Sequence, residues 1–126
     1  MKHLSPKETY ALMQQGIVYV DVRTPEEFAE GRPSGAINIP VSTQVAGVMT
    51  PNPNFVAEVA AKFSPETQLI LGCRSGARSK RAGEALEQAG FTNIVEQRAG
   101  FSGSKNAFGG LEEQGWADAG LPVEKT

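Results

Sequence analysis

The sequence is short of the residues on which several kinds of catalytic and structural site depend. Its 126 residues include one cysteine, Cys73, and one histidine, His3, which is close to the amino terminus. A single cysteine excludes a disulfide within the chain, a cysteine-rich metal site and a relay that needs a second, resolving thiol. Because His3 is the only histidine, we expect neither a Cys–His catalytic pair nor a histidine-based zinc site.

Long apolar runs and a strong overall charge are also lacking. No apolar stretch approaches the roughly eighteen residues that a membrane-spanning helix needs, and the amino-terminal segment has no signal-peptide core. The formal net charge of −2 provides no general attraction for nucleic acid or an anionic membrane. We therefore expect a cytoplasmic protein with neither nucleic acid nor a membrane as its partner, although a presequence could have been removed.

The remaining composition suits one soluble globular domain. Hydrophobic residues make up 40% of the chain and charged residues 21%, and 126 residues can bury a single core. No internal repeat or change of composition marks a boundary, so residues 1–126 are predicted to form one domain.

Helical and strand patterns alternate along the chain. The stretches Ser5-Pro6-Lys7-Glu8 and Thr24-Pro25-Glu26-Glu27 are capping boxes, each of which predicts the start of a helix. Helices are expected at residues 6–15, 25–30, 55–63 and 76–89, and strands at residues 17–22, 36–40, 68–71 and 93–95. Residues 41–54 are expected to be irregular. Connections too long for hairpins predict an α/β fold, with a mostly parallel sheet covered by helices.

The segment after Arg98 has a different character. Residues 99–110 include four glycines, which is typical of a flexible surface connection. The same segment follows a predicted strand at the edge of the sheet where Cys73 lies, so it could equally form the rim of a pocket. Trp116 is predicted to anchor the carboxyl-terminal segment to the core.

The chain is organised around its cysteine. A predicted strand ends at Gly72, Cys73 follows, and a helical pattern begins after a short loop. In sheets of this kind ligands bind at the carboxyl ends of the strands. A free thiol, with a pKa of about 8.5, is mostly protonated at neutral pH, but helix amides and nearby cations favour the thiolate.

The charges around this loop are all of one sign. Four of the twelve basic residues lie between Arg74 and Arg81, and no acidic residue occurs between Gly72 and Gly83. Such a loop is suited to hold an anion, whether a thiolate, a persulfide or a bound oxyanion. We therefore interpret Cys73 as a reactive thiol rather than as a small buried hydrophobic residue.

A second candidate region lies at the end of residues 17–22. Asp21 is predicted to be a structural acceptor for loop amides or a partner for an arginine, in preference to a catalytic group. Arg23 and Glu27 are close enough in sequence to pair, and such a pair contributes little if it is exposed.

Four stretches together resemble a single-domain rhodanese of the thiosulfate sulfurtransferase-like family. They are Asp21-Val22-Arg23-Thr24-Pro25-Glu26-Glu27-Phe28, Gly35-Ala36-Ile37-Asn38-Ile39-Pro40, Cys73-Arg74-Ser75-Gly76-Ala77-Arg78-Ser79 and Gly120-Leu121-Pro122-Val123. They occur in the family's order over nearly the whole chain, and the Cys73 loop is the specific part. The resemblance implies a rhodanese-like α/β fold with a central, mostly parallel five-stranded sheet flanked by helices on both faces.

The resemblance also implies a chemistry. Cys73 would attack the outer sulfur of thiosulfate, or of a related persulfide donor, and would carry that sulfur as a persulfide to a thiol or to cyanide. The substrate-binding residues would be those of the loop, Arg74, Ser75, Gly76, Ala77 and Arg78. Their N–H groups would hold the terminal sulfur, and Arg78, together with Arg74, would balance its charge.

The other expected roles follow from the same resemblance. Asp21 and Arg23 would support the loop structurally, and neither a metal nor an organic cofactor is required. The expected partners are a small anionic sulfur donor such as thiosulfate and a thiol or protein acceptor of sulfur. The chain departs from the family pattern at Arg32-Pro33-Ser34, where His-Ile-Pro is common, and in the longer, glycine-richer residues 99–116.

Other functions remain as alternatives. Cys–Arg loop phosphatases and arsenate reductases have five residues between Cys and Arg, whereas four separate Cys73 from Arg78, a ring expected to be too tight for phosphate. A sulfur carrier that docks on a partner protein, using residues 99–110, would share the same loop and have weak thiosulfate activity. The intact Cys73 and Arg78 count against a non-catalytic scaffold.

Overall fold

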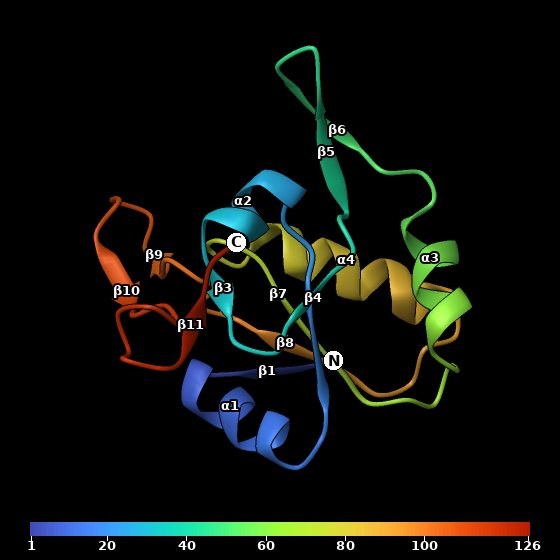
Figure 1. Ribbon diagram of the computed structural model, residues 1–126, viewed down its shortest axis with the longest axis horizontal. Helices are drawn as coiled ribbons and strands as arrows, with labels where there is room; N and C mark the ends of the chain where they lie inside the picture. Colours follow the sequence, from blue (N-terminus) through green and yellow to red (C-terminus); the bar gives the residue numbers. More distant parts are fainter.

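Five parallel strands form the central sheet of the computed structural model, which describes residues 1–126 (Figure 1). In spatial order the strands are β1 (Lys2–Leu4), β8 (Ile94–Gln97), β7 (Leu69–Gly72), β2 (Val18–Asp21) and β4 (Ile37–Asn38). Every neighbouring pair is parallel. Strands β7 and β8 are buried along their whole length, as expected for central strands covered on both faces.

Helices cover both faces of this sheet. On one face α3 (Phe55–Lys62) and α4 (Ala77–Gln88) contribute to the larger apolar cluster. On the other face α1 (Pro6–Gln14) and α2 (Pro25–Glu30) pack against a smaller cluster around Trp116. The predicted α/β fold, with a five-stranded parallel sheet between helices, is confirmed.

The two capping boxes form as predicted. Ser5 caps α1 with Glu8, and Thr24 caps α2 with Glu27, each side chain bonding the backbone of the other residue. The Glu27 Oε1 atom accepts the Thr24 N–H at 3.1 Å. The capping box at the start of α2 therefore helps to fix the position of the Glu27 side chain.

Two predictions about the chain path are wrong. Residues 41–54 were expected to be irregular, but β5 (Ser42–Val45) and β6 (Val48–Pro51) form an antiparallel hairpin. Its turn residues, Ala46 and Gly47, both have positive φ, the conformation that two-residue hairpin turns require. Strand β1 was not predicted at all, because its short Lys-His-Leu sequence carries no strand pattern.

Residues 99–110 are not merely a flexible connection. Strand β9 (Ser104–Lys105) pairs with β10 (Leu111–Glu113), while β3 (Arg32–Pro33) pairs with β11 (Val123–Glu124). Trp116 anchors the carboxyl-terminal segment as predicted: it is fully buried, and its Nε1–H donates to the Pro122 carbonyl at 2.7 Å. None of the helices is long and apolar enough to span a bilayer.

Candidate active site

The cysteine loop connects β7 to α4 at the carboxyl edge of the sheet. Cys73 directly follows β7, and Gly76 caps the first turn of α4. The Gly76 N–H donates to the Cys73 sulfur at 3.1 Å. Gly76 has φ of +105°, and a Cβ there would lie 2.6 Å from the Arg98 carbonyl oxygen, so this turn requires glycine.

A second segment lies along the back of this loop and holds its backbone. The Phe101 N–H donates to the Cys73 carbonyl at 2.7 Å, and the Ser102 N–H donates to the Arg74 carbonyl at 2.9 Å. Gly100, with φ of +71°, packs so closely on Arg74 and Ser75 that a side chain there would overlap their backbone. The sequence pointed to a pocket rim in residues 99–110 but not to these loop-holding residues.

The thiol itself is buried between the loop and α4. Cys73 is 2% exposed, and its sulfur lies 3.4 Å from the Ser79 hydroxyl oxygen. Ser79 in turn bonds the carboxylate of Glu96 on β8. Neither Ser79 nor Glu96 is recognisable as part of the site from the sequence, since Glu96 is a single acidic residue in a strand and no motif links it to residue 79.

Both loop arginines contact one carboxylate. The Arg78 Nη1 and Nη2 atoms donate to the two oxygens of Glu27 at 2.6 and 3.0 Å, and the Arg74 Nε donates to Oε2 at 3.1 Å. Partial burial opposes ionisation of Glu27, but the hydrogen bonds from Arg78 and from the Thr24 backbone lower its pKa to about 2. The contact with Glu27 likewise raises the pKa of Arg78.

This arrangement corrects one predicted contact. Glu27 does not pair with Arg23, as their spacing suggested, because its side chain points to the arginines of the cysteine loop. With Glu27 ionised, the group of Arg74, Arg78 and Glu27 carries one net positive charge. The site therefore keeps an excess of positive charge near Cys73, although less than the two arginines alone would supply.

Arg23 pairs instead with Asp21. The Arg23 Nη2 atom donates to the Asp21 Oδ2 at 2.7 Å and to the Gly31 carbonyl at 2.6 Å, and both side chains are 2% exposed. The Arg23 backbone N–H donates to Asp21 Oδ1, and its guanidinium lies over the Phe101 ring at 4.6 Å. Asp21 thus accepts hydrogen bonds from both a loop amide and an arginine.

Two cavities adjoin the cysteine loop and share Arg74. One, of about 380 Å³, is lined without any hydrophobic side chain by Arg74, Ser75, Ser102, Gly103 and Lys105. The other, of about 350 Å³, lies between α2 and the β5–β6 hairpin and is lined by Thr24, Glu26, Glu27, Glu30, Gln44, Met49 and Arg74. The first is the better match for a small anion, because both of its charged groups are cations.

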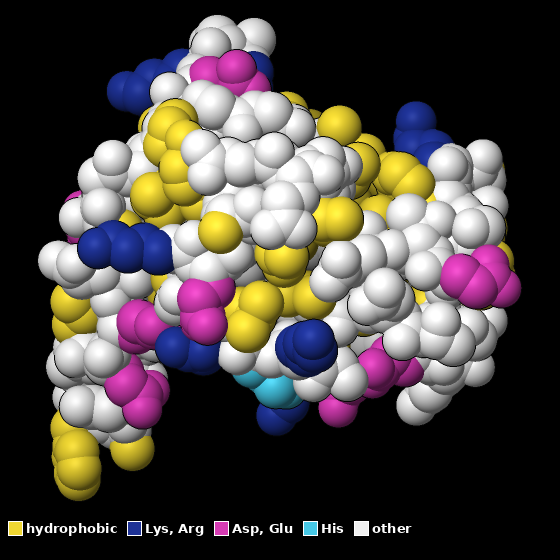
Figure 2. All heavy atoms as spheres, turned by 90° about the horizontal axis from the view of Figure 1, so that it is seen from below, with side chains coloured by type: hydrophobic (Ala, Val, Ile, Leu, Met, Phe, Trp, Pro, Cys, Tyr) yellow, Lys and Arg dark blue, Asp and Glu magenta, His cyan; other side chains and the backbone are white.

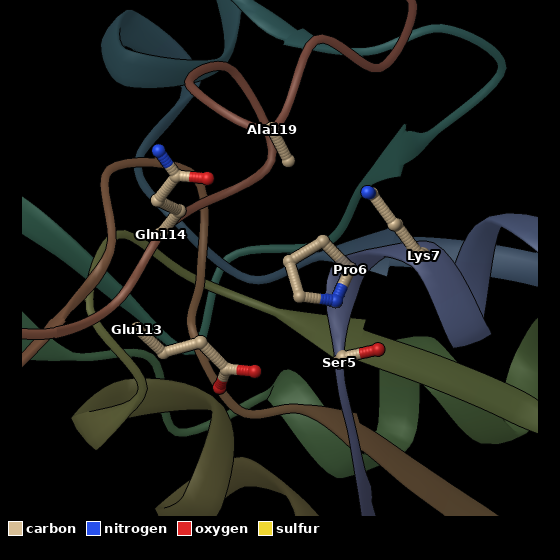
Figure 3. A pocket seen from close by; sticks show the side chains of 6 residues that line it. All are labelled: Ser5, Pro6, Lys7, Glu113, Gln114 and Ala119. Carbon is tan, nitrogen blue, oxygen red and sulfur yellow. The ribbon is translucent and has the colours of Figure 1, made fainter.

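A further pocket lies away from the cysteine loop, between the start of α1 and the carboxyl-terminal segment (Figure 3). The side chains of Ser5, Pro6 and Lys7 face those of Glu113 and Gln114 across it. It contains no residue of the cysteine loop, and no group of three His, Cys, Asp or Glu side chains anywhere in the chain could hold a metal ion.

Comparison with known proteins identifies the family of this chain. The model of the rhodanese-like domain matches residues 5–107. The chain belongs to the rhodanese-like family. This rhodanese-like chain is 39% identical over 113 residues to thiosulfate sulfurtransferase 16 of Arabidopsis thaliana, an alignment that covers 90% of this chain and 84% of the relative.

The relatives differ in how much of their length the domain occupies. The chain is 38% identical to the senescence-associated protein DIN1 of Raphanus sativus, and the alignment covers 90% of this chain but only 56% of that protein. Among solved structures, Rv0390 from M. tuberculosis superposes with a TM-score of 0.81 and 29% identity, covering 100% of this chain and 98% of the other. This chain and Rv0390 therefore share one fold along the whole alignment.

Proposed function

We propose that this protein is a sulfurtransferase that moves a sulfane sulfur from thiosulfate, or from a related persulfide donor, to a thiol or cyanide through a persulfide on Cys73. The observation that carries the proposal is the Gly76 N–H directed at the Cys73 sulfur at the start of α4. The names of two thiosulfate sulfurtransferase relatives, from Arabidopsis thaliana and Haemophilus influenzae, support the choice of donor.

In the first half of the reaction the Cys73 thiolate attacks the outer sulfur of thiosulfate. A sulfur–sulfur bond forms at Cys73 while the sulfur–sulfur bond of the donor breaks, and sulfite leaves with the electron pair of that bond. The persulfide that remains carries one negative charge on its terminal sulfur. The amides of the loop and the start of α4 stabilise this charge.

In the second half an acceptor thiolate or cyanide attacks the terminal sulfur. The bond to Cys73 breaks, and Cys73 leaves as a thiolate that is ready for the next donor. The cavity formed with Arg74 and Lys105 gives an anionic donor a route to the loop. Arg78, once it exchanges its carboxylate partner for the donor, completes the positive surroundings of the reacting sulfur atoms.

A second function is a sulfur carrier that receives its sulfur from a partner protein. One observation favours it: the β5–β6 hairpin presents Val45, Val48 and Met49 to solvent, and Met49 also lines a cavity that Arg74 shares. A partner that docks on this hairpin would reach the cysteine loop. In that case thiosulfate would be a poor donor, with a very high KM, while transfer from the protein donor would be fast.

The proposal is tested by mass spectrometry of the intact protein. Incubation with thiosulfate is expected to add one sulfur atom, which cyanide or a reductant removes, and Cys73→Ser is expected to add none while remaining folded. Absence of a cyanide-reversible adduct on the unmodified chain would contradict thiosulfate as the donor. Turnover of an aryl phosphate that is lost in Cys73→Ser would instead favour a phosphatase. The cytoplasmic location and the extent of the single domain stay predictions.

A further inference from the structure

A buried carboxylate lies behind Cys73 and has no part in the transfer steps above. Glu96 is on β8, is 3% exposed and points to the α4 side of the sheet. Its two oxygens have different partners. The Ser79 hydroxyl donates to Oε2 at 2.8 Å, and His3 on β1, the register partner of Glu96, places its Nδ1 2.6 Å from Oε1.

These contacts form one continuous path. The Cys73 S–H points to the Ser79 oxygen at 3.4 Å, and the Ser79 hydroxyl has a single proton to donate, for which Glu96 at 2.8 Å competes with the Gly76 carbonyl at 3.1 Å. The chain's only histidine ends the path at the surface (cyan in Figure 2), where its side chain is 46% exposed. His3 and Cys73 are not in direct contact: the side chains of Ser79 and Glu96 lie between them.

The chemistry of the thiol gives this path a use. The reactive form of Cys73 is the thiolate, yet Cys73 is 2% exposed, so its thiol has little contact with water that could take the proton. Burial of a thiolate beside an ionised carboxylate is also unfavourable, because two negative charges would share a poorly solvated region. Transfer of the proton to that carboxylate removes both difficulties at once.

We propose that Ser79, Glu96 and His3 carry the thiol proton of Cys73 to solvent when the cysteine is activated. The S–H proton moves to the Ser79 oxygen as the Ser79 hydroxyl proton moves to Glu96 Oε2. Cys73 becomes a thiolate and Glu96 a neutral carboxyl group, so the net charge of the site is unchanged. The carboxyl group then loses its proton to solvent at its His3 contact, which restores the carboxylate.

Other charged groups surround the two ends of the path. Arg78 on α4 and Tyr19 on β2 interact electrostatically with Cys73, and Asp21 on β2 interacts with both of them. At the other end, Arg98 donates to the His3 carbonyl and pairs with Glu113. All of these groups are kept in the variants below, so a change in pH dependence reports on the path itself.

The experiment measures the rate at which Cys73 takes up sulfur from thiosulfate, by stopped flow, as a function of pH. In Glu96→Gln the neighbouring contacts keep a similar shape, but the amide cannot accept a proton. We expect uptake at pH 7 to fall by at least tenfold, a modest value for loss of a general base, and to recover toward the unmodified rate above about pH 9. Ser79→Ala should behave in the same way, and it provides a second variant if Glu96→Gln folds poorly.

The outcomes separate this inference, which rests on the proposed function, from that function itself. If the unmodified protein forms no persulfide, the proposed function fails. If it forms the persulfide and Glu96→Gln keeps both the rate and the pH profile, the proton path is overturned. Faster uptake by Glu96→Gln at low pH would also overturn it, because Glu96 would then act only as a charge that opposes the thiolate.

His3 is tested by chemical rescue. In His3→Ala the path loses its outlet, and we expect the uptake of sulfur from thiosulfate by the resting thiol form of Cys73 to slow several-fold at pH 7 and to be restored by added imidazole, which can reach the exposed position. Glu96→Gln is the matched control, since imidazole cannot replace the lost carboxylate and should not restore its rate. If His3 only tied β1 to β8, the loss in His3→Ala would not respond to imidazole, and the role of His3 would be refuted.

Discussion

Two arginine–carboxylate groups lie near the carboxyl end of β2, and they differ in their surroundings. Asp21 and Arg23 are both 2% exposed, and Arg23 is held further by the Gly31 carbonyl and the Phe101 ring. Glu27 and Arg78 are 16% and 15% exposed, and Glu27 lines a cavity that solvent can enter. The first group has no room for another partner, whereas the second can exchange one anion for another.

This difference in exposure suits the Asp21–Arg23 pair to a structural role and the Glu27–Arg78 pair to anion binding. A charge in the Asp21–Arg23 pair that lost its partner would remain buried and uncompensated, which is strongly unfavourable. Arg78 can instead leave Glu27 for a dianion from solvent, because both remain close to water. Glu27 therefore holds the loop arginines in place before the donor arrives, and the donor must compete with it.

The largest expected effect is on stability, at the buried pair. Arg23→Ala leaves the Asp21 carboxylate buried and unpaired, so we expect the free energy of unfolding to fall by about 3–5 kcal/mol. Denaturant unfolding measures it, and Asp21→Asn combined with Arg23→Ala is the matched control, which should recover part of the loss. The comparison between the two groups fails if Arg78→Ala is as destabilising as Arg23→Ala.

The next effect is on catalysis, at Arg78. Arg78→Ala is expected to lower kcat/KM for thiosulfate by about 1.5–3 kcal/mol, which is roughly 10- to 150-fold, because a charged hydrogen bond to the donor is lost. Steady-state kinetics with cyanide as acceptor measures it. Arg78→Lys keeps the positive charge but lacks the planar guanidinium, so its kcat/KM should lie between those of the unmodified protein and Arg78→Ala. An unchanged kcat/KM would remove the role assigned to Arg78.

Glu27 gives an effect that depends on pH. Its pKa is lowered to about 2 in the folded state, so its contribution to stability is present above the ordinary carboxyl pKa and is lost as pH falls through about 2. After allowance for solvent screening, we expect the unmodified protein to lose about 2 kcal/mol more than Glu27→Gln between pH 5 and 2. Urea unfolding at several pH values measures this loss.

The same variant tests whether Glu27 competes with the donor. Glutamine can still cap α2, so the helix start is preserved while the negative charge is removed. We expect the KM for thiosulfate to fall in Glu27→Gln, because Arg74 and Arg78 are then free to bind it. A higher KM would mean that Glu27 assists the donor, and the comparison would need to be reversed.

The smallest expected effect is at Lys105, on the rim of the anion cavity. Lys105→Ala should raise the KM for thiosulfate about two- to five-fold, as suits an exposed charge, with kcat unchanged. Added salt should shrink the difference, because salt screens charges at the surface. An effect that persisted at high salt would mean that Lys105 contacts the donor directly.

The parts of the site that sequence reasoning found are the local ones. Both capping boxes, the start of a helix near residue 76 and the position of Cys73 after a strand depend on residues a few positions apart, which the sequence displays directly. The contacts that it missed join distant positions. Arg78 and Glu27 are in contact although 51 positions apart in the sequence, and His3 and Glu96 although 93 positions apart.

The errors in the fold have the same origin. Strand β1 takes its conformation from pairing with β8 and not from its own three residues, so no apolar alternation marks it. Residues 41–54 contain a glycine at position 47, which with Ala46 forms the turn of a hairpin. A glycine between two such short strands is compatible with either outcome.

The segment behind the cysteine loop has a consequence for the energetics of the reaction. The N–H groups of Phe101 and Ser102 donate to the Cys73 and Arg74 carbonyls, so these two peptide groups are held in a fixed orientation. The dipoles of the loop are thus oriented before any charge develops on the terminal sulfur. Water around a free persulfide would have to reorient as the charge forms. The backbone of this loop does not have to reorient, because folding has already fixed the orientation of its peptide groups.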